Sequence, residues 1–300
     1  MRNKLLTVIA VCAAAILLVA FLSLDREPRY GDRVLHEWIH LFPTAVDVRA
    51  GKAAQAENAI QQIGTNAIPF LLRWLSTEWQ PSRSKQRLAT FVRNIPFLTR
   101  FHPISRWALG ADPLQRRADE AAAAFEALGS NAAPAIPELA RLATYSPQSG
   151  TARRAVDALV NIGPITLPAL LTVITNANAQ ARFYAVTSIQ SFGTNARPAI
   201  PMLLTYRGDA TLASGVYEVL GRLKLEPQEV VPALERTAHD PNPSQRSLAI
   251  IVLGDYGAYA KPAVPVLMAA LSDADSGVLD SATNALNVIA PEILATPQHK

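Results

Sequence analysis

The residues with the clearest chemical potential lie near the start of the chain, in the segment VLHEWIHLF, Val34 to Phe42. Within it, His36, Glu37 and His40 form the pattern H-E-x-x-H. On a helix the two histidines stand four residues apart on one face, where both imidazoles can bind one metal ion. Glu37 would then activate a metal-bound water, as in zinc peptidases. The pattern predicts either a zinc site or a helix that carries two histidines on its solvent side.

The surroundings of this pattern favour the second interpretation. A zinc site needs a third protein ligand, and only about eleven residues separate His36 from a long apolar run upstream. Pro43 and Val46 stand where the extended pattern H-E-x-x-H-x-x-G-x-x-H has glycine and histidine. Glu57 is the only acidic candidate at a plausible distance along the chain. We therefore expect a short capping helix with His36, Glu37 and His40 on its solvated side. The residues expected on its buried face are Val34, Leu35, Trp38, Ile39 and Leu41.

The apolar run upstream extends from Leu5 to Leu24 without a charged residue. As a helix it would span roughly 30 Å, the thickness of one hydrocarbon core. It lacks a clear A-x-A cleavage site, which favours an uncleaved signal anchor over a removed signal peptide. Arg2 and Lys4 precede it, so residues 1–4 are expected in the cytoplasm and the large C-terminal domain outside, in the periplasm. The arginines that follow the run at 26, 29 and 33 weaken this orientation. We expect a single-pass protein of the inner or plasma membrane.

The rest of the chain repeats itself. Three stretches read LGSNAAPAIPEL from Leu128, FGTNARPAIPML from Phe192 and YGAYAKPAVPVL from Tyr256, and their glycines lie 64 residues apart. Shorter versions start at Ile63 and Ile162, and a glycine-free version, LEPQEVVPALE, starts at Leu225. The repeating unit is therefore about 32 residues long.

Each unit predicts two helices joined by a turn. Before the glycine, positions −1, −4, −7 and −8 are apolar or aromatic in all four units compared, which is the stripe of an amphipathic helix. The glycine ends this first helix in the left-handed conformation, and a proline starts the second helix. The expected turn residues are Gly64, Gly129, Gly163, Gly193, Gly257, Pro69, Pro137, Pro168, Pro201, Pro232 and Pro265. A leucine stands two residues after each of these prolines, which indicates a second buried position.

On these residues the sequence resembles the HEAT-repeat family, including the HEAT-like repeats of phycobilin lyases. That family shares the pattern A-x-x-L-x-x-[IL]-G, a short turn, and A-[IV]-P-x-L. It also carries an arginine eleven residues before the glycine, which Arg182 and Arg246 match and Ala118 and Ala152 do not. The segment YGDRVLHEWI is also similar to an opening element, Y-x-G-x-x-L-x-x-W-[LI], of bacterial membrane-anchored HEAT proteins. The resemblance implies an all-α fold: an α-solenoid, or HEAT-repeat superhelix, with an N-terminal transmembrane helix.

Residues 78–113 do not follow the repeat. The slightly longer range 78–117 carries eight basic residues against Glu78 and Asp112, a net charge of +6, in a chain whose total is +4. Interspersed aromatic residues predict a surface that contacts a partner or the membrane, or an extended segment whose aromatics pack on the repeats. The candidate contact residues are Arg83, Lys85, Arg87, Arg93, Arg100, Arg106, Trp79 and Trp107.

The expected organisation is a tail (1–4), a signal anchor (5–24), a linker with the capping helix (25–51), repeat 1 (52–77), the insertion (78–113), repeats 2 to 7 with the last truncated (114–294), and a tail (295–300). The resemblance implies a scaffold that binds a protein partner through an inner groove lined by second helices. We expect no catalysis, cofactor, nucleic acid or small-molecule substrate. The alternatives are a membrane-tethered zinc metallopeptidase that uses the HEWIH segment, and a HEAT-fold enzyme such as a lyase.

Overall fold

The computed structural model describes residues 26–42, 50–77, 87, 90–91 and 113–295. The transmembrane helix expected at 5–24 and nearly all of the insertion at 78–113 lie outside these ranges. Within the ranges, no helix combines the length and the apolar character needed to cross a membrane.

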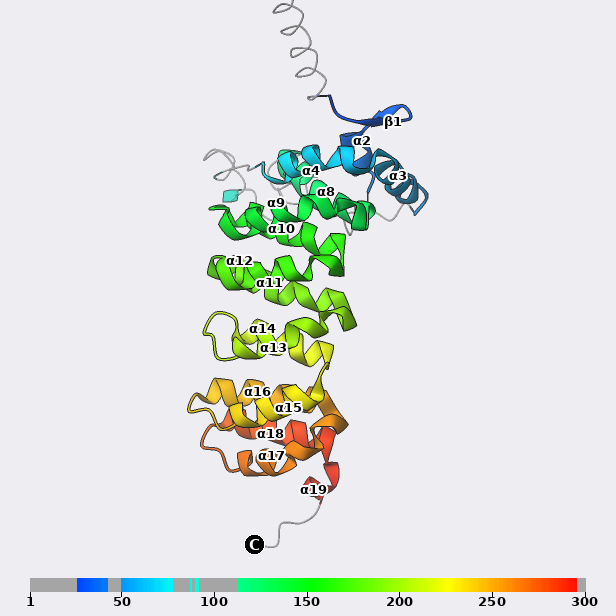
Figure 1. Ribbon diagram of the computed structural model, residues 1–300. Helices are drawn as coiled ribbons and strands as arrows, with labels where there is room; N and C mark the ends of the chain where they lie inside the picture. The colour runs from blue at the N-terminus through cyan, green and yellow to red at the C-terminus, as the bar shows by residue number, and fades with distance from the viewer. Residues whose placement is uncertain (1–25, 43–49, 78–86, 88–89, 92–112, 296–300) are drawn as a thin grey trace, which may run out of the picture.

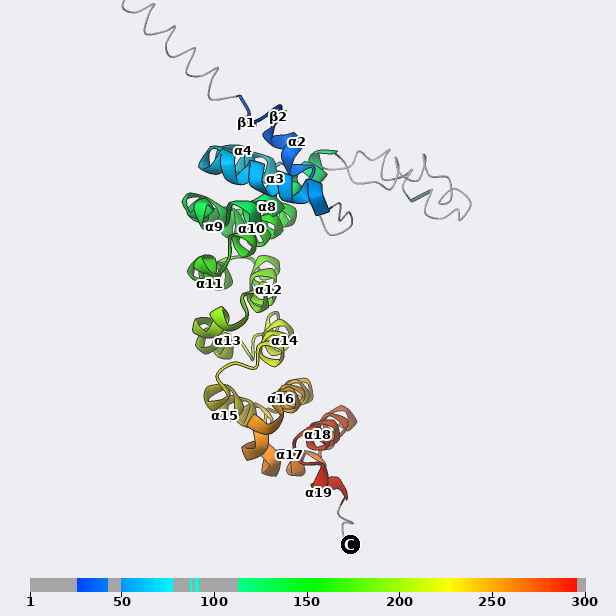
Figure 2. The ribbon, with the colours of Figure 1, turned by 90° about the vertical axis from the view of Figure 1, so that its right-hand side faces the viewer.

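Pairs of helices stack on one another along a single column (Figure 1). A view turned by 90° shows two layers, with the first helix of each pair in one and the second helix in the other (Figure 2). The first helices are α3 (Ala50–Ile63), α8 (Pro113–Leu128), α10 (Ser149–Ile162), α12 (Ala179–Ser188), α14 (Ala213–Leu223), α16 (Pro243–Tyr256) and α18 (Ser276–Ile289). The second helices are α4 (Ile68–Leu75), α9 (Ile136–Tyr145), α11 (Leu167–Asn176), α13 (Ile200–Thr205), α15 (Pro227–Thr237), α17 (Val264–Ala270) and α19 (Pro291–Ala295).

The core is a continuous apolar seam between the two layers. Every one of the sixteen stripe residues expected on the first helices is buried, and the leucine after each of the six turn prolines is fully buried. First helices also pack on the first helices of neighbouring units, α8 on α10 and α16 on α18. No pair could cover its own stripe, so each unit depends on its neighbours for burial.

The turns between the two helices begin at glycines with positive φ. They continue as short 3₁₀ segments, η1 (Gly64–Ala67), η2 (Gly129–Ala135), η3 (Pro164–Thr166), η4 (Ile189–Ala199) and η5 (Gly257–Ala263). At Gly193, φ is 53° and ψ is −128°, and at Gly257 they are 54° and −123°. The expected left-handed helical conformation is therefore wrong at these two positions, and also at Gly163, where φ is 108° and ψ is −171°. The chain needs a sharper reversal to enter the 3₁₀ segment, and this ψ is open to glycine but costly for any residue with a Cβ.

The glycine-free turn between α14 and α15 reverses the chain with residues that carry a Cβ, so its backbone is more strained. Lys224 ends α14 at φ 51° and ψ 33°, and Glu226 precedes α15 at φ 49° and ψ 54°. Both are left-handed conformations that cost a residue with a Cβ about 1–2 kcal/mol. The hydroxyl of Tyr256 donates a hydrogen bond to the carbonyl of Leu225 between them, at 2.7 Å, which helps to hold this turn.

The expected role of Pro232 is wrong. Five turn prolines lie at the first or second position of their second helix, but Pro232 lies inside α15, which begins at Pro227. The left-handed residues before Pro227 close the turn earlier than in the other units, so the second helix starts a turn earlier. Pro232 then falls where its missing N–H removes one hydrogen bond from the helix interior.

A small element covers the N-terminal end of the column. Strands β1 (Arg29–Tyr30) and β2 (Arg33–Val34) form an antiparallel hairpin, and helix α2 (Leu35–Ile39) follows it and contacts α3 and α8. The all-α expectation missed this hairpin. Its two-residue loop starts at Gly31, whose φ of 62° fits the turn types that join two twisted strands. Leu35, Trp38 and Ile39 of α2 are buried as expected, whereas Val34 in β2 and Leu41 after the helix are only partly buried.

Arginines of the first helices tie successive units together. Arg182 donates to the carbonyl of Ile174 at the end of α11 and pairs with Asp209 of the next loop at 3.1 Å. Arg246 donates to the carbonyl of Asp240 after α15 and pairs through two nitrogens with Asp273, at 2.6 and 2.8 Å. Each guanidinium thus satisfies a carbonyl at a helix end and joins it to a carboxylate of the following unit.

We expect opposite effects on the stability of the fold from replacing a turn glycine by alanine and from replacing a turn lysine by glycine. Gly193→Ala should lower stability by about 1–3 kcal/mol, because alanine is strained at the observed φ and ψ. Lys224→Gly should raise it by up to about 1 kcal/mol, because glycine adopts the left-handed conformation without that strain. Thermal unfolding of the detergent-solubilised full chain, followed by circular dichroism, measures both. Equal melting temperatures for the two variants would contradict the assigned turn geometry.

The contact between Arg246 and Asp273 should make stability depend on pH. The hydrogen bond from Arg246 lowers the pKa of Asp273 below its ordinary value, so the carboxylate stabilises the folded state above the unfolded pKa, near 3.9. That contribution is lost as the pH falls through the lowered folded pKa. Asp273→Asn should therefore lower the melting temperature at pH 7 and pH 5, with the difference narrowing below about pH 4. Asp280→Asn, at an exposed position of α18, is the matched control and should show no such trend.

Candidate functional site

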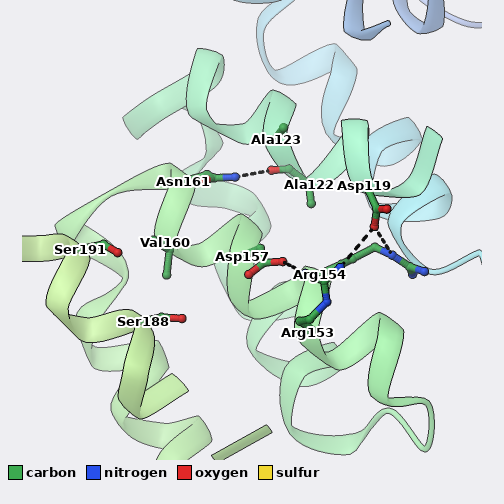
Figure 3. A pocket seen from close by; sticks show the side chains of 10 residues that line it. All are labelled: Asp119, Ala122, Ala123, Arg153, Arg154, Asp157, Val160, Asn161, Ser188 and Ser191. Atoms are coloured by element: carbon green, nitrogen blue, oxygen red, sulfur yellow. Dashed lines mark hydrogen bonds and ion pairs between the residues drawn. The ribbon is translucent and has the colours of Figure 1, made fainter. Parts of the chain in front are cut away.

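A polar pocket lies across three successive first helices (Figure 3). It has a volume of about 440 Å³, and we call it the first-helix pocket. Helix α8 contributes Asp119, Ala122 and Ala123; α10 contributes Arg153, Arg154, Asp157, Val160 and Asn161; α12 and η4 contribute Ser188 and Ser191. Because neighbouring repeats place equivalent helix positions side by side, residues about 32 apart along the chain meet in one hollow.

The charges of the first-helix pocket form one balanced network. Arg154 is nearly buried and donates to Asp119 at 3.0 Å and to the carbonyl of Leu75 at 2.9 Å. Arg153 pairs with Asp157 at 3.2 Å and approaches Asp119 at 3.7 Å. Burial raises the pKa of Asp157, an effect that Arg153 only partly offsets. Two guanidinium groups and two carboxylates give the pocket no net charge.

This arrangement is suited to binding through hydrogen bonds. The hydroxyls of Ser188 and Ser191 point toward the hollow from the side opposite α10 (Figure 3). Asn161 donates to the carbonyl of Ala122 at 2.9 Å, which fixes α10 against α8. None of the described lining residues is a histidine, cysteine or lysine, so the pocket lacks the usual partners of a serine nucleophile.

A second pocket lies where the capping element meets α8, and we call it the α2–α8 pocket. It has a volume of about 550 Å³. Its lining residues are Arg33, His36, Glu37, His40, Leu41, Pro113, Arg116, Arg117 and Glu120. A smaller cavity of about 380 Å³ lies between the hairpin and α3. None of the three cavities includes a residue of a second helix.

The two histidines of HEWIH are held by two different carboxylates. Nδ1 of His36 lies 2.6 Å from Glu27, and Nδ1 of His40 lies 2.9 Å from the nearly buried Glu120. Glu37 accepts a hydrogen bond from the backbone N–H of Val34, which caps α2. His36 is half-buried and His40 and Glu37 are exposed, as expected of a solvated side. These contacts attach the capping element to itself and to α8, and they favour a structural role for the motif.

A metal ion at this place meets two obstacles. The carboxylates beside His36 and His40 are not among them, because metal-bound histidines commonly have a carboxylate at their other ring nitrogen. The described ranges contain no group of three or more histidine, cysteine, aspartate or glutamate side chains that could hold a metal ion. Three arginines also line the pocket, and their charge opposes a cation.

The other expected contact residues are almost all outside the described ranges. Of the candidate contact residues in the insertion, only Arg87 is described, and it is exposed. The positions of Arg83, Lys85, Arg93, Arg100, Arg106, Trp79 and Trp107 lie in the ranges that the structure does not describe. Their contact role therefore stays a prediction.

Comparison with known proteins identifies one part of the column of repeats. A family model described as HEAT repeats matches residues 197–287. This stretch is a run of HEAT repeats. The HEAT-repeat match covers α13 to α18, and the units before it have the same helix–turn–helix form. HEAT repeats form helical scaffolds that typically mediate contacts between proteins.

Two further comparisons add little about function. No curated protein matches the chain. A crystal structure of an engineered protein is similar over 86% of this chain and 96% of that chain, at 19% identity and a TM-score of 0.26. Similarity this weak carries no meaning for function.

Sequence reasoning missed the residues that make the two larger pockets. Glu120 and Glu27, and not Glu57, contact the histidines. The packing of α8 on α2 brings Glu120 to His40, 80 positions away, whereas Glu27 lies only nine residues before His36. The Arg153–Asp157 pair had a signal in its spacing of four residues. Arg116 and Arg117 also had a signal in the sequence, because they are adjacent arginines near the start of a helix whose first turn contains no acidic residue.

We expect the purified full chain to contain no stoichiometric zinc, because the described ranges place no set of three metal-binding side chains at this pocket and three arginines line it. Metal analysis of the wild type and of His36→Ala measures this. Zinc at one equivalent that is lost in His36→Ala would instead establish HEWIH as a metal site.

Proposed function

We propose that the protein is a membrane-anchored HEAT-repeat scaffold without catalytic activity that binds a protein partner. The observation that carries the proposal is the first-helix pocket, in which donors and acceptors from three successive repeats are presented on rigid helices. HEAT repeats at 197–287 support the scaffold class. The apolar run at 5–24 supports the anchor, in a single-pass inner or plasma membrane topology with the repeats outside the cytoplasm, in the periplasm.

The structure favours a different surface from the inner groove of second helices. The pocket presents the Asp157 carboxylate, the Arg153 guanidinium and the hydroxyls of Ser188 and Ser191 within one hollow. A polypeptide segment with exposed backbone amides and carbonyls can use both donors and acceptors of this kind. The balanced charge favours such a segment over a highly charged ligand, because neither sign of charge is in excess.

A photo-crosslinker at Ser191, on the rim of the first-helix pocket, should give a discrete product in the cell's own membranes. The same group at the exposed Thr172, on second helix α11, should give much less. Ala123→Arg fills the pocket and should abolish the Ser191 product, whereas Thr172→Arg adds the same side chain elsewhere and should leave it. Deleting residues 1–25 should release the protein from the membrane fraction.

Other outcomes would place the binding elsewhere. Equal products from both crosslinker positions, or a product unaffected by Ala123→Arg, would rule out the first-helix pocket. Loss of the product on charge reversal of Arg83, Arg87 and Arg93, with Ala123→Arg neutral, would place the partner on the insertion instead.

A further inference from the structure

The α2–α8 pocket contains more positive charge than its acidic residues neutralise. Glu37 already accepts the backbone N–H of Val34 at 3.0 Å, and Glu120 lies 2.9 Å from His40. No carboxylate in the described ranges forms an ion pair with Arg33, Arg116 or Arg117. Three guanidinium groups therefore line one open cavity of about 550 Å³ while its two carboxylates have other partners.

Two of these guanidinium groups are positioned by aromatic rings and not by acids. Arg33 lies over the ring of Trp38, with Cζ 5.1 Å from the centroid, and Arg117 lies over Trp74 at 5.7 Å. A cation–π contact holds a guanidinium near a ring without a carboxylate and leaves N–H groups able to donate. Trp38 and Trp74 are both buried, so each arginine lies against a fixed ring.

The start of α8 adds to the positive potential. Arg116 and Arg117 lie within the first five residues of α8, whose first turn contains no acidic residue. The N-terminal end of a helix carries a partial positive charge, so cations there are unfavourable unless an anion lies nearby. The same end of the helix, together with fork-shaped donors, matches the oxygens of a tetrahedral anion.

We propose that the α2–α8 pocket binds a phosphate group. Three arginines suit a dianion with several acceptor oxygens better than a single carboxylate, since each guanidinium can donate to a separate oxygen. A divalent metal ion, the other ligand that this motif brings to mind, would have to lie among the same three positive charges. The site is separate from the first-helix pocket and does not depend on the proposed protein partner. The phosphate is a headgroup of an anionic lipid or belongs to a soluble phosphate compound.

Calorimetric titration of inorganic phosphate into the full chain, in a nonionic detergent, tests the site. We expect saturable binding of one equivalent. Arg116→Gln should weaken it about tenfold or more, the effect of losing one charge-assisted hydrogen bond. Arg116 is exposed, so this change should leave the melting temperature unaltered. The matched control is Arg236→Gln, an equal loss of charge at an exposed position of α15, which should leave the affinity unchanged.

Nanodiscs distinguish the two sources of phosphate. In discs of phosphatidylcholine with phosphatidic acid, a lipid source predicts weaker apparent binding of inorganic phosphate than in phosphatidylcholine alone, and Arg116→Gln should remove this competition. A soluble source predicts equal affinity in both discs.

Three outcomes would overturn the proposal. They are the absence of saturable phosphate binding, equal weakening by Arg116→Gln and Arg236→Gln, and binding of added zinc at one equivalent that His36→Ala abolishes while phosphate has no effect.

Discussion

The structure depends on one constraint: a pair of short helices cannot bury its own apolar face, so burial must be shared between neighbouring pairs. The stripe of each first helix meets the leucine of its second helix and the stripe of the next unit, and together they form one seam along the column. Stacking first helix on first helix also fixes what the surface can present. Equivalent positions of successive repeats lie side by side, and both the first-helix pocket and the arginine contacts between units follow from that register.

The sequence predicted this seam well because it is periodic. The sixteen stripe positions and six leucines repeat with the turn glycines, so each unit checks the others, and all of them are buried. Single deviations were harder to predict. The sequence around LEPQEVVPALE does not show that Lys224 and Glu226 take left-handed conformations and that α15 begins at Pro227. Alignment with the neighbouring units points instead to Pro232 as the start of the helix. The hairpin was missed because two-residue strands have no periodicity, although Gly31 gave a local signal.

The candidate sites could be predicted much less completely, for a physical reason. Each pocket is made by residues from different units, so its composition depends on which helix faces which. Arg154 shows the difficulty. It lies two residues from the expected arginine position, and its carboxylate partner is in the preceding unit, on α8, with a further hydrogen bond to the end of α4. Arg182 and Arg246, in contrast, have their carboxylate partners in the following unit. A shift of two residues on a helix turns a side chain to another neighbour, and a sequence without its structure does not say which neighbour that is.

At the N-terminal end of the column, the need to cover the apolar seam also determines how the polar and charged side chains of this region are paired. An end repeat exposes one side of the seam, and the capping element covers it with Leu35, Trp38 and Ile39. A helix as short as α2 cannot be stable alone, so it is held by polar contacts around its edge: Glu37 to the backbone, His36 to Glu27 and His40 to Glu120. Those contacts use the carboxylates of this region for structure. Arg33 and Arg117 on the same edge lie over Trp38 and Trp74, and no carboxylate in the described ranges forms an ion pair with them. The histidines that first suggested a metal therefore take hydrogen bonds of the nearby carboxylates, and the N–H groups of the arginines stay available to a ligand.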